Sequence, residues 1–266
     1  MSARTSRLGL RVVALGYLFL LLAAPIGLIF FRTFEHGIGP AIDAVTTPEA
    51  QHAFYLTFVM IAVAVSLNTV FGVTCALLLV RSRMPGKALV NAFIEMPFAV
   101  SPVVIGLALV LVYGNDGWFG GWLAEQGIQV IFSVPGMILA TIFVSLPFVV
   151  REVVPVLREI GTEQEQAAST LGASGWQTFR RITLPSIRWG LTYGIVLATA
   201  RALGEFGAVS VVSGKLSGET ETATLLVENR FHQFDLTGAY AASVVLAVMA
   251  LTVLLAMNLL NRRREA

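Results

Sequence analysis

Charged residues are scarce in this chain of 266 residues, where Asp, Glu, Lys and Arg together make up 13%. Hydrophobic residues make up 56%, and the mean hydropathy is +0.78. A soluble domain has about 25% charged residues, so this composition argues against one and predicts a chain embedded in a membrane. Cysteine is nearly absent too. The single Cys75 falls inside an apolar segment and cannot form a disulfide within the chain.

Motifs for enzyme chemistry are also missing. The nucleotide-binding pattern G-x-x-x-x-G-K-[ST] fails, because Leu216 follows Lys215 and Val209 stands where the first glycine is required. There is no H-E-x-x-H pair, no cysteine cluster and no G-x-S-x-G motif. We therefore expect no catalytic residue, no bound metal and no cofactor held by this chain. The histidines are scattered through predicted outer loops, where we expect solvated side chains: His36, His52 and His232.

Long apolar segments take the place of charge. Six of them approach the ~20 residues that an α-helix needs to cross a bilayer. The first has a long apolar run and no small-residue cleavage motif after it, so it is read as a membrane helix that is retained. We expect an all-α polytopic membrane protein with six transmembrane helices. The predicted spans cover residues 12–31, 54–80, 88–112, 135–150, 189–212 and 238–260.

Basic residues are distributed unevenly over the predicted loops. With the N-terminus in the cytoplasm, only Arg32, Lys215 and Arg230 fall outside, and Arg201 lies within a span. Such a bias toward the inner side predicts cytoplasmic N- and C-termini. The short basic tail, 261–266, is interpreted as a stop-transfer anchor, because nucleic-acid binding requires a soluble basic surface. The fourteen inner residues are Arg4, Arg7, Arg11, Arg81, Arg83, Lys87, Arg151, Arg158, Arg180, Arg181, Arg188, Arg262, Arg263 and Arg264.

A polar segment at 162–185, TEQEQAASTLGASGWQTFRRITLP, interrupts the apolar pattern between the fourth and fifth spans. It predicts two short helices joined by a turn. Thr162 and Glu165 match the S/T-x-x-E capping box that begins a helix. Gly172 suits the left-handed backbone that commonly ends one. Two capped helices in a membrane-protein loop suggest that another molecule docks there.

The second helix of this segment has a capping box of its own, Ser174 with Gln177. Trp176, Phe179 and Ile182 follow at helical spacing and predict one apolar face. Pro185 is expected to close the unit before the next span. The alternative interpretation is an amphipathic helix that lies on the membrane surface beside Arg180 and Arg181.

The segment resembles the cytoplasmic coupling loop of ABC-importer permeases, with the signature E-A-A-x-x-x-G … I-x-L-P. It departs from the signature at Gln166, where the pattern has Glu, while Glu165 stands one residue early. The matching positions are Ala167, Ala168, Gly172, Ile182, Leu184 and Pro185. The resemblance implies a docking site for an ATPase made of Gln166, Ala167, Ala168, Leu171, Gly172, Trp176, Phe179, Ile182, Leu184 and Pro185.

The third predicted span contains two prolines, Pro97 and Pro102, which remove backbone donors and should break the helix between them. Broken helices at membrane depth are tolerated where the backbone is buried in protein or lines a water-filled cavity. Pro97, Ser101 and Pro102 are therefore candidates for a pathway wall. A proline kink that serves packing alone is an equally good interpretation.

Ionisable residues within spans are costly and require a reason. Arg201 and Glu205 are four residues apart in the fifth predicted span and can pair on one helix face. Glu95 lies about two turns into the third. The pair either fixes one helix against its neighbour, or Arg201 faces an anion path while Glu205 holds it in place.

The stretch 201–214, RALGEFGAVSVVSG, is similar to the fifth-span signature of sulfate/thiosulfate importer permeases, and of their W-type subunit in particular. Further similarity lies at 97–106, 135–147 and 218–228, so most of the chain from about residue 54 onward is covered. Molybdate permeases share the R-A-L-G-E-F-G-A core. The V-S-V-V-S-G and G-E-T residues that follow favour sulfate.

This resemblance implies a type I ABC-importer permease fold with a cytoplasmic coupling helix, in the bacterial cytoplasmic membrane. It implies a T-type permease partner in a heterodimer, two copies of a cytoplasmic ATPase that uses ATP, and an external sulfate-binding protein. The expected organisation is an N-terminal segment with the first span at 1–53, a permease domain at 54–260 that includes the coupling loop, and the tail at 261–266.

Other classes remain open from the sequence. A molybdate or tungstate permease would share the core signature. A secondary transporter would place ions in spans too, but it usually shows paired inverted repeats with two broken segments, and only the third span is plainly broken here. A structural or assembly protein could use the loop for docking, but it would not need Arg201 and Glu205 at membrane depth.

Overall fold

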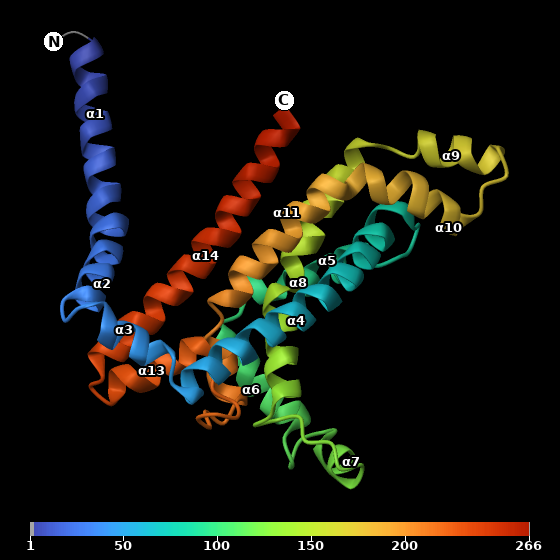
Figure 1. Ribbon diagram of the computed structural model, residues 1–266. Coiled ribbons are helices and arrows are strands. Elements are labelled where there is room, and N and C mark those ends of the chain that lie inside the picture. Colours follow the sequence, from blue (N-terminus) through green and yellow to red (C-terminus); the bar gives the residue numbers. More distant parts are fainter. Residues whose placement is uncertain (1–2, 266) are drawn as a thin grey trace.

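The computed structural model describes the backbone of residues 3–265 and the side chains of residues 10–255. All regular secondary structure within residues 3–265 is helical, as expected (Figure 1). The α-helices are α1 (Ala3–Leu18), α2 (Ala24–Phe34), α3 (Ile38–Val45), α4 (Pro48–Arg81), α5 (Lys87–Ala99), α6 (Pro102–Tyr113), α7 (Gly120–Glu125), α8 (Val134–Glu159), α9 (Glu163–Thr170), α10 (Gly175–Thr178), α11 (Leu184–Leu203), α12 (Gly207–Val212), α13 (Ala223–His232) and α14 (Leu236–Glu265). Two π-helical turns lie at Phe19–Ala23 and Phe179–Thr183.

Helices α4, α8 and α11 form the centre of the molecule. The backbones of α4 and α8 approach closely at Gly72, where an added Cβ would lie 2.7 Å from Val149 Cγ1. Asn68 is fully buried one turn away, and its side-chain amide donates to the Ile142 carbonyl at 3.1 Å and to Ser145 Oγ at 2.9 Å. A small residue and a polar side chain at a helix interface are typical of packing in a bilayer, where apolar burial gives little drive between helices.

The N-terminal helix stands apart from this bundle. Its apolar run is Leu10–Phe34. In the most hydrophobic part of that run, no residue is buried inside the molecule. Figure 1 shows α1 diverging from the rest, while α2 meets α14 at the end that carries α3. A π turn precedes Pro25: the N–H of Ala24 donates to the Phe19 carbonyl. The wider turn accommodates a proline that cannot donate a backbone hydrogen bond.

The prediction of six transmembrane spans is not confirmed within the described residues. Four helices are long and apolar enough to cross a membrane: Leu10–Phe34, Pro48–Arg81, Val134–Glu159 and Leu236–Leu255. Helices α5 and α6 count as a fifth crossing if the bent pair is one span. The fifth predicted span, 189–212, is divided instead between α11 and α12. Arg188, Arg201 and several small or polar residues lower the hydropathy of α11.

The two ends of the molecule carry different elements. Figure 1 shows α9 and α10 at one end, with the beginning of α1 and the end of α14 directed toward the same side. The opposite end carries α3, α7 and α13, which lie in the predicted outer loops. The side chains of the predicted basic tail, 261–266, lie outside the described residues. The polar unit at 162–185 is thus set apart from the predicted outer loops.

Candidate coupling site and pathway residues

The turn between α9 and α10 has the local geometry expected from its sequence. Gly172 has φ +84°, in the left-handed region that favours glycine. Ser174 caps α10: its hydroxyl accepts from the Gln177 N–H at 3.3 Å, and the Gln177 side chain accepts from the Ser174 N–H at 2.9 Å. The predicted left-handed glycine and the second capping box are both confirmed.

The first capping box was predicted wrongly. Thr162 is the N-cap residue of α9, but its side chain accepts from no backbone N–H of that helix. Its hydroxyl instead accepts from Gln166 Nε2 at 2.9 Å. Glu165 has its partners elsewhere. Its carboxylate pairs with Arg81 at the end of α4, with 2.9 Å between Arg81 Nε and Glu165 Oε2, and accepts from Thr183 Oγ1 at 2.8 Å.

Arg81 joins three elements through one guanidinium. Besides Glu165, it donates to the carbonyls of Leu157 at 3.1 Å and Gly161 at 2.6 Å, where α8 ends. A cation at carbonyls left free by a helix end is favourable both as a hydrogen-bond donor and toward the helix dipole. Arg81 and Thr183 are functional candidates that the sequence alone did not identify. The only signal available was an arginine at the end of a span, which also has a topological explanation.

Pro185 does not end the unit, contrary to the prediction. The chain runs from α10 through the π turn Phe179–Thr183 directly into α11, with all intervening residues in helical dihedrals. The N–H of Leu184 donates to the Phe179 carbonyl, one residue further back than in an α-helix. This wider turn gives the ring of Pro185 space that the α-helical carbonyl four residues earlier would occupy.

The unit exposes large apolar side chains. Leu171 is 88% exposed and Trp176 is 68% exposed. The rings of Trp176 and Phe179 stack with centroids 5.5 Å apart, so the predicted shared face is confirmed for this pair. Phe179 and Leu184 pack against the core formed by α4, α8 and α11, and Ile182 is half-buried. Gln166 and Ala167 are exposed, and Ala168 is half-buried.

The third predicted span is broken at the two prolines, as expected. Helix α5 ends at Ala99 with Pro97 inside it, α6 begins at Pro102, and the two meet at an angle of 115°. Ser101 is exposed at the break. The break lies against the beginning of α12, since an added Cβ on Gly207 would be 2.9 Å from Pro102 Cβ.

The predicted ion pair is present at the end of α11. Arg201 Nη1 lies 2.7 Å from Glu205 Oε2, and the two side chains are 31% and 2% exposed. Glu205 Oε1 also accepts from the Ala208 N–H at 2.9 Å, which satisfies one free donor at the start of α12. The Glu205 carboxylate therefore connects the end of α11 to the start of α12. Pro102 and Glu205, which were predicted for separate reasons, both lie next to the first turn of α12.

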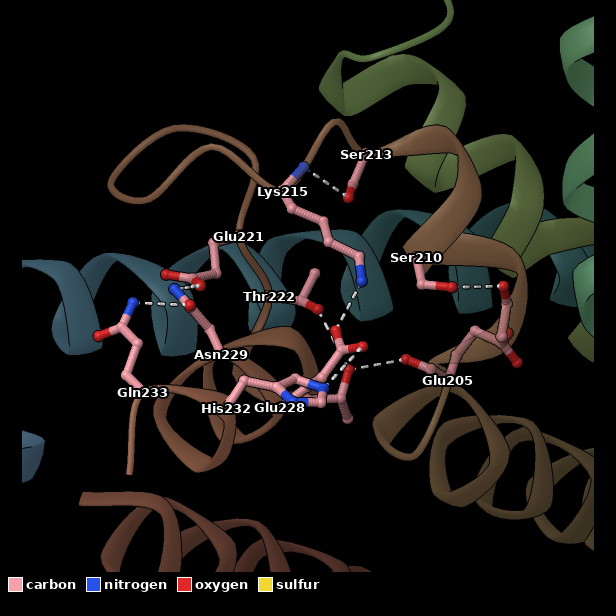
Figure 2. A network of polar contacts seen from close by, with 12 residues as sticks. Glu205, Ser210, Ser213, Lys215, Glu221, Thr222, Glu228, Asn229, His232 and Gln233 are labelled. Carbon is pink, nitrogen blue, oxygen red and sulfur yellow. Dashed lines mark hydrogen bonds and ion pairs between the residues drawn. The ribbon is translucent and has the colours of Figure 1, made fainter. Parts of the chain in front are cut away.

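Polar contacts from the end of the molecule that carries α13 reach this break (Figure 2). The Thr224 hydroxyl donates to the backbone carbonyl of Glu205 at 2.9 Å. Lys215 Nζ donates to Glu228 Oε2 at 2.7 Å, and the Asn229 amide donates to Glu221 Oε1 at 2.8 Å. These contacts hold α13 and the segment 213–222 against the break between α11 and α12.

Among the histidines, His232 lies beside this network, with its Nε2 3.9 Å from Glu228 Oε1 (Figure 2). His36 and His232 are exposed, as expected. His52 is half-buried, and its Nδ1 is enclosed without a hydrogen-bond partner among the described residues, so the expectation of a solvated ring is wrong for His52. His52 lies near the start of α4, where Ala50 and Ala53 pack against α13 and α14.

Comparison with known proteins agrees with this architecture. The chain is 51% identical over 251 residues to the sulfate transport system permease protein CysW of Synechocystis sp., covering 94% of this chain and 91% of that protein. It is 47% identical to CysW of Escherichia coli K12, covering 92% and 84%, and 36% identical to CysT of the same organism, covering 92% and 88%.

Solved structures share the fold at low sequence identity. A bacterial ABC transporter involved in the import of the acidic polysaccharide alginate has a chain that matches with a TM-score of 0.78 at 20% identity, covering 96% of this chain and 94% of that one. Residues 68–266 match the family described as "Binding-protein-dependent transport system inner membrane component". The broken spans, the exposed helical unit at 162–185 and these similarities lead to one conclusion: the chain belongs to the family of binding-protein-dependent transport system inner membrane components, the permeases of ABC importers.

Proposed function

We propose that this chain is the W-type permease subunit of an ATP-driven importer of sulfate or thiosulfate, and that it forms half of the translocation pathway. The observation that carries the proposal is the identity of 47–51% to sulfate transport permeases over more than nine tenths of the chain. The lower identity of 36–41% to T-type permeases favours the W-type assignment.

The proposed assembly contains partners that supply what this chain lacks. A T-type permease completes a heterodimer, and two copies of a cytoplasmic ATPase use ATP. An external sulfate-binding protein delivers the anion. A related alginate importer has been solved with a periplasmic protein that carries its ligand, which is consistent with such a partner. The N- and C-termini are placed in the cytoplasm, on the same side as α9 and α10.

The unit at 162–185 is the proposed contact with the ATPase. Leu171 and Trp176 are exposed, and Phe179 stacks on Trp176 while packing into the core. Force applied to Trp176 would therefore act on α11, because α10, the π turn and α11 are continuous. Glu165 and Arg81 connect the same unit to α4 and α8.

The proposed pathway residues are Pro97, Ser101, Pro102, Arg201 and Glu205. Arg201 is the residue of this set that can attract an anion, but its guanidinium is already paired with Glu205. A fully paired arginine attracts a dianion weakly, so a role for Arg201 in transport requires that it leave Glu205 as the pathway opens.

Uptake of radiolabelled sulfate tests this function. The chain is expressed with its partner subunits in a strain that lacks sulfate importers, and uptake is measured with excess unlabelled thiosulfate or molybdate. We expect sulfate uptake that requires this chain and that thiosulfate reduces. Uptake that molybdate abolishes, with no effect of thiosulfate, would replace the proposed substrate class by molybdate.

A further inference from the structure

An open cavity of about 410 Å³ lies between α4, α5 and α8, apart from the α11–α12 break. Three of its lining residues are basic: Lys87 begins α5, and Arg151 and Arg158 are two turns apart on α8. Asn91 adds a neutral amide and Glu95 a carboxylate. At neutral pH the lining thus has a net charge of two positive, which matches a dianion.

None of these charged groups has an opposite charge within 4.0 Å among the described residues. The Cβ of Glu152, next to Arg151 in the sequence, lies against Gly194 on α11. The guanidinium of Arg151 lies over the ring of Phe98, 5.0 Å from its centroid. A cation–π contact orients an arginine without neutralising it, so the positive charge remains available to a ligand.

Helix stability does not explain this arrangement. Arg158 lies in the last turn of α8, where a cation is favourable, but Lys87 is the first residue of α5, where a cation is unfavourable. Gly86, the N-cap of α5, gives no side-chain acceptor to the free N–H groups of its first turn. Arg151 lies about 10 Å from Arg158 toward the start of α8, so it is not at the helix end, where a cation is favourable.

We propose that this cavity binds a tetrahedral oxyanion at the end of the molecule that carries α9 and α10. Lys87, Arg151 and Arg158 supply the charge, and Asn91 supplies a neutral donor. Two sources have this chemistry: a sulfate ion leaving the importer, and the phosphate of an anionic lipid in the inner leaflet. The first source rests on the proposed function, and the second does not.

A reporter cysteine measures the charge in the cavity without relying on transport. Ala88 lines the cavity and is exposed, and Cys75 is the only native cysteine. The assembled importer carries Ala88→Cys in a Cys75→Ala background, in nanodiscs of neutral phosphatidylcholine. Its reaction rate is compared for two methanethiosulfonate reagents, one bearing a sulfonate and one a quaternary ammonium.

With each rate divided by that reagent's rate with a small free thiol, we expect the anionic reagent to react faster. Arg151→Gln with Arg158→Gln should reduce its relative rate about fivefold compared with the cationic reagent. The matched control is Arg83→Gln, which removes an exposed basic residue nearby that does not line the cavity, and it should leave the ratio unchanged. Equal rates for the two reagents, or a ratio unaffected by the double change, would overturn the proposal.

Protection distinguishes the two sources. If sulfate is the ligand, millimolar sulfate slows the reaction of Ala88→Cys in neutral discs. If a lipid phosphate is the ligand, sulfate has no effect and discs with phosphatidylglycerol give the protection. Absence of protection in both conditions would overturn the binding site. Sulfate uptake is measured for the same variants in sealed proteoliposomes. If uptake of sulfate fails while the anion preference of the cavity is intact, the proposed function alone has failed.

Discussion

Two regions of this molecule each use one carboxylate and one arginine to hold a turn, and they differ in what they leave exposed. At the α11–α12 break, Glu205 is 2% exposed and pairs with Arg201, four residues away. At the 162–185 unit, Glu165 is 20% exposed and pairs with Arg81, 84 residues away. The first region is enclosed within the bundle, while the second presents Leu171 and Trp176 to its surroundings.

The enclosed α11–α12 break is therefore expected to stabilise the fold, whereas the exposed 162–185 unit is expected to contact a partner. A change at the enclosed break should lower stability first, because it leaves a charge without its partner in a buried place. A change on the exposed surface of the unit should spare the fold and reduce the proposed partner interaction. Four changes test this distinction, in order of decreasing effect.

Arg201→Gln should have the largest effect. It leaves the buried carboxylate of Glu205 without its cation, and breaking a buried pair costs about 3–5 kcal/mol. Glu205→Gln should cost less, because Arg201 is 31% exposed and can be solvated. Thermal unfolding of the purified importer measures both, and the double change should be milder than Arg201→Gln alone.

Transport by the double variant then decides between the two interpretations of this pair. If the pair is structural only, a stably inserted double variant regains uptake. If Arg201 guides the anion, the double variant stays inactive. Full uptake by both single variants and the double variant would exclude both roles.

The double variant Trp176→Ala with Phe179→Ala should have the second-largest effect. Aromatic anchors at an interface commonly cost about 2 kcal/mol or more when truncated, so the ATPase should be lost from the permease on detergent purification while the chain stays in the membrane. Trp118→Ala is the matched control, since Trp118 is 87% exposed but lies in the predicted outer loop between α6 and α7. If the ATPase is retained at wild-type levels, the proposed contact would instead be made by Ala167, Ala168 and Leu171.

The two aromatic residues can also be separated. Trp176 is exposed, whereas Phe179 packs into the core as well. Trp176→Ala alone should therefore weaken ATPase binding with no change in unfolding temperature, and Phe179→Ala alone should lower both. A loop that only lies on the membrane predicts weaker lipid partitioning and no loss of ATPase from either variant.

Gly172→Val should have a smaller effect, through backbone geometry alone. A left-handed conformation costs about 1–2 kcal/mol for a residue with a Cβ, and Gly172 has no atom within 4 Å that a Cβ would meet. Sulfate uptake should fall while membrane insertion stays normal. Gly175→Ala is the control, since Gly175 lies in α10 and also has open space. Uptake equal to wild type, with ATPase bound, would show that this turn geometry is dispensable.

The interaction between Glu165 and Arg81 should make the smallest contribution, tested by Glu165→Gln and Arg81→Gln. The pair is partly buried, and exposed pairs contribute about 0.2–1 kcal/mol, so a coupling energy near 1 kcal/mol is expected from a double-mutant cycle on unfolding. Arg81→Gln should cost more than Glu165→Gln, because Arg81 also donates to the Leu157 and Gly161 carbonyls. A coupling energy of zero would mean that the carboxylate and the guanidinium only lie near each other.

Interactions within a few residues could be predicted from the sequence. The left-handed backbone at Gly172, the capping box at Ser174 and Gln177, the break between Pro97 and Pro102, and the pairing of Arg201 with Glu205 all depend on local geometry. A capping box spans three residues and a helix pair spans four, so the residue types and their spacing determine the contact.

Competition between local and distant partners was decided only by the tertiary structure. Glu165 has the spacing for a capping box, but the packing of α4 against α8 brings Arg81 to it, and a charged donor outcompetes a backbone N–H. The continuous passage through Pro185 likewise depends on a π turn that no sequence pattern announced. Composition determined that the chain is helical and lies in a membrane, because apolar length and scarce charge allow little else. Which cation pairs with Glu165, by contrast, depended on a residue 84 positions away that only the packing of the helices brings near.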